Sequence, residues 1–320
     1  MQSVKKKILI IRFSSIGDVV LTSPIVRAIH NAGHEVHFLI KEKFVPVIES
    51  NPYITKIHYF KKKTDEVINT LKKEKFDFII DLQNNRKSRA VCFFLGISNR
   101  AVSKLNARKL LTVWLKTTSV MPKVHIVDRY FNAARDMGIF KDSDGLDFFI
   151  NENKLDFSKW KDVTTSYIVI VAGGSYATKK IPTDKLKEIF LHLKHKTIVL
   201  LGDINDAVEV KDTAAQFNNV INKCGELNLH ESAYLIKNSE YVITSDTGLM
   251  HVAAAFKKKI FSLWGNTIPE FGMYPYLPMP GSKILEVKNL WCRPCSKLGF
   301  SKCPLGHFRC MKQIDISVIA

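Results

Sequence analysis

The sequence predicts an α/β protein made of two doubly wound, Rossmann-like domains that face a central cleft. Three observations predict this class. The chain has 320 residues, too many for one ordinary core and about right for two. Short apolar runs alternate with amphipathic stretches of helical length, and this series occurs twice. Between the two series, residues 140–163 are polar and hold no sustained period, which is typical of a linker.

The first series begins with an apolar run at residues 7–13, which predicts a buried strand. A loop of small residues follows, and then a helix from Val19 to Asn31 that ends before Gly33. Strands covered by helices on both faces favour a parallel sheet. The other elements expected here are strands at 34–40, 54–60 and 76–81 and helices at 65–75, 87–95 and 125–137.

The second series starts after the polar stretch. Its expected strands are 167–172, 197–201, 241–244 and 259–264, and its expected helices are 183–194, 208–217, 230–237 and 248–256. We therefore expect an N-terminal domain at residues 1–155 and a C-terminal domain at residues 156–320. Ligands of open α/β sheets bind beyond the carboxyl ends of the strands, so the loops that follow the strands are the places to seek chemistry.

The composition narrows the class of partner. The formal net charge is +18, which favours anionic partners such as phosphorylated glycans or anionic lipid. No nucleic-acid-binding signature is present, so nucleic acid is not expected as a partner. No run approaches the roughly 20 apolar residues that span a bilayer. Arg12 and Asp18 break the N-terminal apolar run, which therefore predicts a strand rather than a signal peptide. We accordingly expect a cytoplasmic protein.

The first candidate site is the turn from Arg12 to Asp18, where a strand passes into a helix through serines and one glycine. This turn places backbone N–H groups and the carboxylate of Asp18 at the cleft. A carboxylate near a helix start also interacts favourably with the positive end of the helix dipole, and this simpler interpretation stays open. A dinucleotide fingerprint needs three glycines here, so a dehydrogenase is disfavoured.

A second strand-to-helix turn lies at residues 243–251. Gly248 lets a ligand approach the backbone, and the free N–H groups of the first helical turn form an anion site suited to a diphosphate. The alternative is an ordinary capped helix with Asp246 or Thr247 as the N-cap residue.

The third candidate is the stretch from Gly173 to Pro182, which contains Lys179 and Lys180. A lysine held against a diphosphate neutralises the charge that builds up on a leaving group. A solvated surface lysine is the alternative for both positions, and we favour it for Lys180.

Several of these segments together resemble glycosyltransferase family 9, the ADP-heptose:lipopolysaccharide heptosyltransferases. The resemblance spans nearly the whole chain in the right order, and no single motif carries it alone. The segments are Ser14-Ser15-Ile16-Gly17-Asp18, Asp81-Leu82-Gln83 with Arg86 and Ser88, residues 246–255, and Leu263-Trp264-Gly265-Asn266-Thr267 with Pro269.

The resemblance implies a GT-B fold, with the acceptor on the N-terminal domain and the nucleotide sugar on the C-terminal domain. It implies an inverting, metal-independent transferase with no cofactor, in which Asp18 is the general base on the acceptor hydroxyl. The family's ribose-contacting glutamate falls at His230 or Glu231. The implied donor-binding residues are Lys179, Asp246, Thr247, Gly248, Leu249, Met250 and His251. The implied acceptor-binding residues are Ser14, Ser15, Gly17, Gln83 and Arg86.

Four of the six cysteines lie near the C-terminus, at Cys292, Cys295, Cys303 and Cys310. The first pair has the spacing of a zinc knuckle, and the other two thiols are enough to complete a four-thiolate site. The sequence leaves a structural metal and reduced buried thiols both open, and we favour reduced thiols. A disulfide is not expected in a cytoplasmic protein.

The leading interpretation is transfer of heptose from ADP-heptose to the inner core of lipopolysaccharide, by an enzyme that contacts the anionic inner face of the cytoplasmic membrane. One alternative is the same fold acting with another nucleotide sugar and glycan. The other is a non-catalytic protein that binds nucleotides or polyanions. Asp18 discriminates against the latter, because a binding module does not need a carboxylate at that turn.

Overall fold

The computed structural model describes residues 5–163 and 166–319 and divides into two compact units. The first unit comprises residues 1–104 and 124–151, and the second comprises residues 105–123 and 152–320. The sequence predicts one division, after residue 155. Residues 105–123 instead join the second unit, because Leu105 and Val113 pack against a small apolar cluster of Met121, Ile268 and Phe271.

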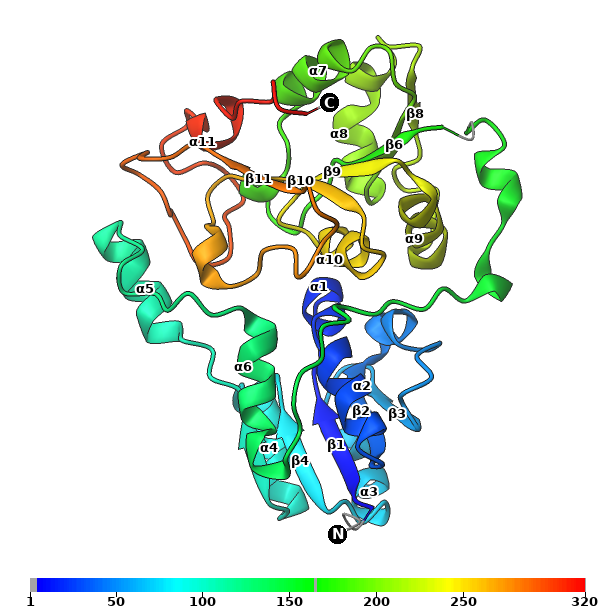
Figure 1. Ribbon diagram of the computed structural model, residues 1–320, viewed down its shortest axis with the longest axis vertical. Coiled ribbons are helices and arrows are strands. Elements are labelled where there is room, and N and C mark those ends of the chain that lie inside the picture. The colour runs from blue at the N-terminus through cyan, green and yellow to red at the C-terminus, as the bar shows by residue number, and fades with distance from the viewer. Residues whose placement is uncertain (1–4, 164–165, 320) are drawn as a thin grey trace. The chain divides into compact units, whose positions relative to one another are not determined.

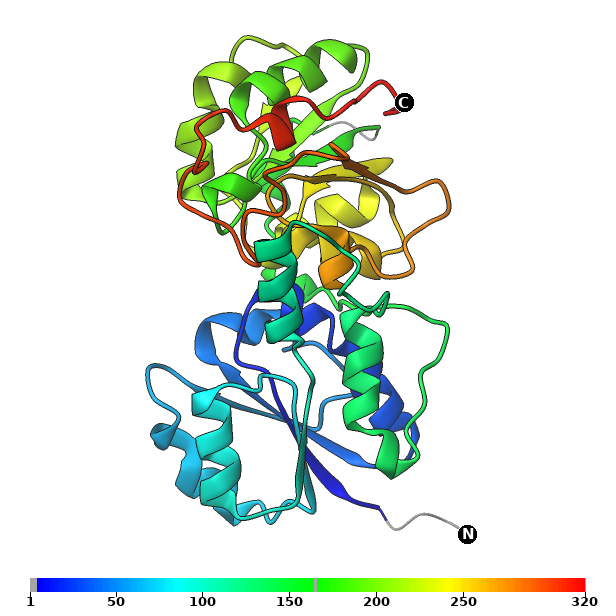
Figure 2. The same cartoon turned by 90° about the vertical axis from the view of Figure 1, so that its left-hand side faces the viewer.

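The first unit is a doubly wound domain built on a five-stranded parallel sheet in the order β3-β2-β1-β4-β5. Helices α3 and α4 pack on one face, and α2 and α6 lie on the other (Figures 1 and 2). The strands are β1 Lys7–Ile11, β2 Glu35–Lys41, β3 Lys56–Phe60, β4 Phe78–Asp81 and β5 Asn99–Ala101. The helices are α1 Ile16–Val20, α2 Ser23–Asn31, α3 Asp65–Lys73, α4 Arg86–Leu95 and α6 Ile126–Ala133.

Strand β1 is the centre of this sheet. Its residues from Ile8 to Ile11 are fully buried, because helices cover both of its faces. Leu9 and Ile11 belong to the apolar cluster under α3 and α4, and residues of a strand alternate between faces, so Ile8 and Ile10 point to the other layer. This explains why the strand reads as a continuous apolar run rather than an alternating one.

The second unit is a doubly wound domain with a six-stranded parallel sheet in the order β11-β10-β9-β6-β7-β8. Helices α7 and α8 cover one face and α9 and α10 the other (Figure 1). The strands are β6 Ile168–Val171, β7 Ile198–Leu201, β8 Val220–Asn222, β9 Tyr241–Ser245, β10 Lys259–Trp264 and β11 Lys283–Glu286. The helices are α5 Asn106–Leu115, α7 Thr183–His192, α8 Ile204–Ala214, α9 Leu229–Asn238, α10 Gly248–Ala255 and α11 Arg309–Lys312.

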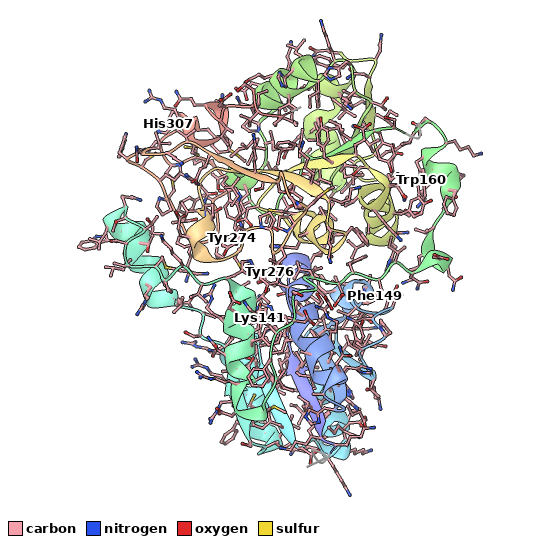
Figure 3. All side chains as sticks on the ribbon, in the orientation of Figure 1. Lys141, Phe149, Trp160, Tyr274, Tyr276 and His307 are labelled. Carbon is pink, nitrogen blue, oxygen red and sulfur yellow. The ribbon has the colours of Figure 1, made fainter. Side chains whose placement is uncertain are left out.

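The polar stretch before β6 is fixed to the second unit rather than free. The backbone N–H of Asp156 donates to Glu231 on α9 at 3.2 Å. The ring of Trp160, labelled in Figure 3, lies 5.8 Å from that of Tyr234 on the same helix. The predicted irregular segment is therefore present, and it is anchored along α9.

The structure departs from the predicted elements in a few places. The helix predicted from Val19 to Asn31 is two helices, α1 and α2, because Pro24 lies in the first turn of α2, where it lacks a donor N–H. Helix α5 and the short strands β5, β8 and β11 were not predicted. Across residues 5–163 and 166–319, no helix combines the length and apolar character needed to cross a membrane.

Candidate active site

The order of strands reverses once in each sheet, between β1 and β4 in the first unit and between β6 and β9 in the second. Such a topological switch point opens a crevice beyond the carboxyl ends of the two strands, where ligands of doubly wound proteins bind. The segments that follow these four strands carry Asp18, Gln83, Lys179 and Asp246. Four residues that the sequence predicts as site residues therefore follow the strands at the two switch points.

Asp18 lies in the first turn of α1, where two neighbours hold its carboxylate. The guanidinium of Arg12 forms an ion pair with it at 2.5 Å, from Nη2 to Oδ1. The hydroxyl and the backbone N–H of Ser15 donate to its other oxygen at 3.0 and 3.3 Å. The side chain keeps 25% of its surface exposed, so the carboxylate is oriented and still open to solvent.

These contacts determine the protonation state of Asp18. Burial alone raises the pKa of this carboxyl group, but the charge of Arg12 and the hydrogen bonds from Ser15 outweigh burial and lower the pKa below its usual value. Asp18 is therefore an ionised carboxylate at neutral pH, as a general base must be before it accepts a proton.

Arg12 is a residue that the sequence placed in the motif without a role of its own. Its side chain is buried, and it donates to the carbonyl oxygens of Ser14 at 2.8 Å and Leu82 at 2.7 Å. It thus ties the loop after β1 to the loop after β4 and aims its third nitrogen at Asp18. The hydroxyl of Tyr130 on α6 is buried nearby without a hydrogen-bond partner among the described residues, and burial raises its pKa to about 12.

The predicted acceptor-binding residues divide into supporting and exposed groups. Gln83 is buried, and its Oε1 accepts from the backbone N–H of Phe13 at 2.8 Å, so it joins the two loops. Gly17 is buried within α1, whereas Ser15 and Arg86 are exposed. Arg86 is the first residue of α4. Of this set, Ser15 and Arg86 are the side chains that stand open to an incoming ligand.

A charged lysine, Lys179, lies at the switch point of the second unit. The ammonium of Lys179, just after β6, pairs with Asp246 Oδ2 at 2.5 Å. Thr267, in the loop after β10, donates to the same oxygen at 3.1 Å. Loops after three adjacent strands therefore meet at one carboxylate, which holds Lys179 in place beside the start of α10. The sequence motif contained Thr267, but nothing in the sequence linked it to Asp246.

The start of α10 has the geometry expected of an anion site. Thr247 is the N-cap, and its hydroxyl accepts from the N–H of Met250 at 3.3 Å. Gly248 and Leu249 form the half-buried first turn, whose N–H groups point out of the helix. The side chains of Met250 and His251 are buried, so a ligand at this helix start meets backbone rather than these two side chains.

Lys180 and Glu231 make ion pairs and hydrogen bonds within the second unit. Lys180 pairs with Asp206 at 2.8 Å and with Glu209 at 2.7 Å on α8, so it is not the solvated surface lysine that the sequence favours. Glu231 is fully buried and is held by Asn228, Asp156 and Lys159. The glutamate that the resemblance assigns to the ribose therefore has a structural role at this position.

Comparison with known proteins identifies the family. The sequence model of glycosyltransferase family 9 (heptosyltransferase) matches residues 65–302, which is most of the chain. The chain belongs to glycosyltransferase family 9. Lipopolysaccharide heptosyltransferase 1 of Campylobacter coli is 24% identical over 298 residues, covering 82% of this chain and 84% of the relative.

Solved structures confirm the predicted fold class. A glycosyltransferase family 9 protein from Veillonella parvula matches with a TM-score of 0.74 at 21% identity, over 90% of this chain and 87% of the other. The ADP-heptose lipopolysaccharide heptosyltransferase II of Escherichia coli matches with a TM-score of 0.71 at 19% identity, over 92% of each chain. This family 9 protein is thus a glycosyltransferase with the two Rossmann-like domains of the GT-B fold.

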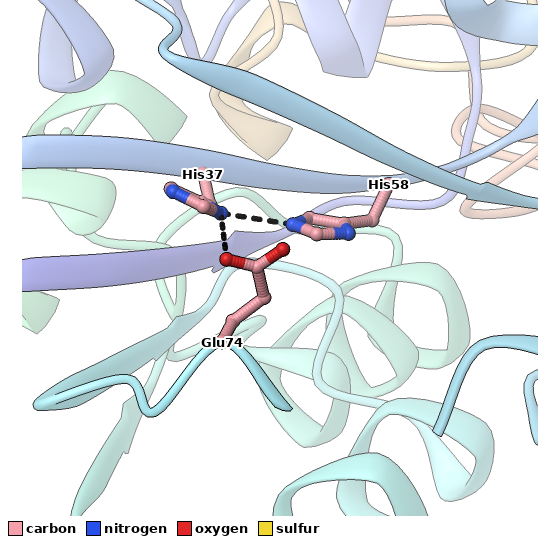
Figure 4. Close-up of side chains that lie close together, drawn as sticks. All are labelled: His37, His58 and Glu74. Atoms are coloured by element: carbon pink, nitrogen blue, oxygen red, sulfur yellow. Dashed lines mark hydrogen bonds and ion pairs between the residues drawn. The ribbon is translucent and has the colours of Figure 1, made fainter. Parts of the chain in front are cut away.

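One group of side chains in the described part of this transferase has the spacing of a metal site. The ligand atoms of His37, His58 and Glu74 all lie within 4.8 Å of one another (Figure 4). His37 and His58 lie within β2 and β3, and Glu74 is the C-cap of α3, so none of the three belongs to the segments that follow β1 and β4 at the switch point. Glu74 already accepts from Lys56 at 2.5 Å and Lys7 at 3.4 Å, which lowers its pKa to about 2. We interpret this group as a hydrogen-bonded ion network.

The C-terminal cysteines are free thiols, as are Cys92 and Cys224. Cys295 donates to the carbonyl of Cys292 at 3.2 Å, and Cys292 Sγ lies 3.9 Å from Nε2 of His307, which Figure 3 labels. Burial raises the pKa of Cys310 to about 12 and also raises that of Cys295. These two thiols are protonated in the absence of a metal, and the choice between a structural metal and reduced thiols stays a prediction.

Proposed function

We propose that this family 9 transferase moves heptose from ADP-heptose to the inner core of a lipopolysaccharide acceptor, with inversion at the anomeric carbon and without a metal ion. The first unit binds the acceptor and the second binds the donor. The observation that carries the catalytic part is Asp18, an ionised carboxylate that Arg12 orients at the switch point of the first sheet.

Asp18 suits the role of general base. It is held from two sides, which fixes its direction, and it retains exposed surface through which a hydroxyl group can approach. A purely structural carboxylate at a helix start needs only the contact with Ser15. The buried guanidinium of Arg12 goes beyond helix capping, because it positions the carboxylate and keeps it charged.

The donor half-site supports departure of a nucleoside diphosphate. The ammonium of Lys179 and the N–H groups at the start of α10 provide positive charge at one switch point. Such fixed donors stabilise charge that develops in the transition state, which is the work a divalent ion does in other transferases. This arrangement is the support for a metal-independent mechanism.

The reaction balances with these groups alone. The acceptor hydroxyl oxygen forms a bond to the anomeric carbon on the side opposite the leaving group, and its proton passes to Asp18. The bond from the anomeric carbon to the phosphate oxygen breaks, and ADP leaves with the electron pair toward Lys179 and α10. Attack from the opposite side inverts the anomeric configuration. The proton on Asp18 then returns to solvent.

Two experiments test the proposal. A thermal-shift screen against ADP-, UDP-, GDP- and CMP-sugars identifies the donor, because the ligand that binds the folded protein raises its melting temperature. Transfer from ADP-heptose to a purified, heptose-deficient lipopolysaccharide is then followed by mass, and the anomeric configuration of the product by NMR. Stabilisation by a different nucleotide sugar overturns the donor. Stabilisation by ADP-heptose with no transfer to any glycan acceptor leaves a binding protein.

The acceptor also suggests a location. A lipopolysaccharide precursor is anchored in a bilayer by its lipid, and we propose that this protein works at the inner face of the cytoplasmic membrane as a peripheral enzyme.

A further inference from the structure

Helix α5 presents a broad apolar surface to solvent. Leu110, Leu111, Trp114 and Leu115 are 55%, 40%, 78% and 46% exposed. At about 100° per residue, these four side chains fall within an arc of about 140° on one side of the helix. This side, which we call the α5 face, is therefore continuous rather than a scatter of single exposed residues.

The opposite side of α5 is firmly packed. Thr112 is fully buried, and Val113 packs in the cluster with Phe271. The ammonium of Lys109 lies 5.5 Å from the ring of Phe271, and that of Lys116 donates to the carbonyl of Pro294 at 2.8 Å. The second unit thus holds the helix in place from behind, so α5 does not need its outer face in order to fold.

The segment that contains α5 is one-sided in charge. Residues 105–123 contain four basic residues, Arg108, Lys109, Lys116 and Lys123, and no Asp or Glu. Arg108 is exposed on the flank of the α5 face, next to its apolar arc. A helix that combines an apolar arc with Trp and a basic flank has the composition of helices that lie in the interface of an anionic membrane.

Trp291 adds a second interfacial side chain. It is 71% exposed, and it lines the same pocket as Lys116, the residue that follows α5. Trp side chains concentrate at the boundary between lipid and water, where the ring is buried and its N–H remains hydrated. A second exposed Trp therefore lies near the C-terminal end of α5.

We propose that the α5 face is the surface by which this enzyme docks on an anionic lipid bilayer, with Leu111 and Trp114 inserted below the headgroups and Arg108 near the lipid phosphates. A second copy of the chain is the other occupant that fits an apolar face, but the basic, acid-free segment 105–123 favours anionic lipid because two such surfaces repel each other. The inference deepens the proposed function, since a lipid-borne acceptor requires the enzyme to reach the membrane.

The test is binding to vesicles, which requires no substrate. The full-length protein is sedimented with vesicles of neutral phosphatidylcholine and with vesicles that contain about 30% anionic phosphatidylglycerol. We expect binding to the anionic vesicles, weakened by salt, and at least about a tenfold loss in the double variant Leu111→Ser/Trp114→Ser. Arg108→Gln should reduce the preference for anionic lipid. The matched control is Ile204→Ser/Val208→Ser, which alters two exposed apolar residues on the acidic helix α8 and should bind as the original protein does.

Fluorescence locates the contact. Of the four Trp residues, Trp160 and Trp264 are buried, so Trp291→Phe leaves Trp114 as the exposed fluorophore. Its emission should shift to the blue on binding to anionic vesicles. Equal vesicle binding by the Leu111/Trp114 double variant and the original protein overturns the inference. So does light scattering that shows the original protein as a dimer and the double variant as a monomer, with no difference in vesicle binding. Vesicle binding without transferase activity leaves the inference standing and refutes the proposed function.

Discussion

Replacing Asp18 with Asn tests the proposed chemistry directly. The amide keeps the shape of the carboxylate and still accepts from Ser15, but it cannot take a proton. General-base catalysis contributes about 100- to 10,000-fold to a rate. Because Arg12 lowers the pKa of Asp18, the carboxylate is a weak base, and we expect a loss of kcat near the lower limit, about 100-fold. That loss corresponds to about 2.7 kcal/mol of transition-state stabilisation.

The same substitution also removes the negative charge that pairs with the buried guanidinium of Arg12. Its bonds to the carbonyl groups of Ser14 and Leu82 remain, so we expect a loss of about 1–2 kcal/mol in the free energy of unfolding. Rates should therefore be measured well below the melting temperature, with ADP binding as a check on the fold. Ser15→Ala is a comparison variant for kcat alone, because Ser15 is also a predicted acceptor-binding residue. It removes one hydrogen bond to Asp18 but leaves the ion pair, so kcat should fall only slightly.

The dependence of the rate on pH gives a second readout. Activity requires ionised Asp18, so kcat/KM should fall only when the pH drops below the usual carboxylate range. Arg12→Gln removes the cation that favours the charged form, which raises the pKa of Asp18 and moves the acidic limb of the profile to higher pH. Turnover of Asp18→Asn within a few-fold of the original enzyme, or an unmoved acidic limb in Arg12→Gln, would refute the assignment of Asp18 as the base.

Three further predictions follow from the donor half-site and the ion network. Lys179→Ala should weaken ADP binding about 10- to 100-fold in calorimetry, as expected for a charge-assisted hydrogen bond. Lys180→Ala should weaken ADP binding less but lower the stability of the fold, because buried Asp206 loses its ion-pair partner. Equal ADP affinity in the two variants would assign diphosphate binding to another cation. Transfer activity should survive EDTA. A prompt loss of activity that magnesium reverses, in a protein that is still folded, contradicts a metal-free mechanism. A slow loss of activity with a lower Tm, together with about one zinc per chain in elemental analysis, reveals a structural metal. Burial lowers the pKa of His58 to about 4 in the folded protein, so as the pH falls the imidazole is protonated in the unfolded chain before it is protonated in the folded one. The free energy of unfolding should therefore fall by about 2–3 kcal/mol as the pH drops from 6.5 to 4. Denaturation at several pH values should show that the free energy of unfolding of His58→Gln depends less on pH than that of the original protein. An unchanged pH dependence would show that another group is responsible.

Periodicity was enough to predict the two sheets except for the short strands β5, β8 and β11, because buried parallel strands are continuous apolar runs and their covering helices have one apolar face. It failed at α5 for the opposite reason. The apolar residues of that helix face solvent, and Leu110, Leu111 and Val113 to Leu115 form an almost continuous run rather than a stripe. A rule that places apolar residues in the core cannot detect a helix whose apolar side lies outside it.

The site shows what spacing can and cannot predict. Asp18 was predicted as a site residue because it lies in a local strand-to-helix turn. Its contact with Arg12 also lies within that turn, but the link from Phe13 to Gln83 spans 70 residues and depends on the pairing of β1 with β4. The neighbours Lys179 and Lys180 look equivalent in the sequence. In the structure the first pairs with Asp246 and the second with Asp206, so adjacent lysines serve different loops.

The three passages of the chain between its units, near residues 104, 123 and 151, affect how the enzyme can be taken apart. A fragment cut after residue 155 carries α5 away from Ile268 and Phe271, the partners that cover its inner side. Neither unit is one continuous piece of gene. An exchange of donor domains between related transferases by a single crossover would therefore combine α5 from one parent with the apolar cluster of the other. Exchanging residues 105–123 together with 152–320 keeps α5 with its own cluster and is the recombination expected to yield folded chimeras.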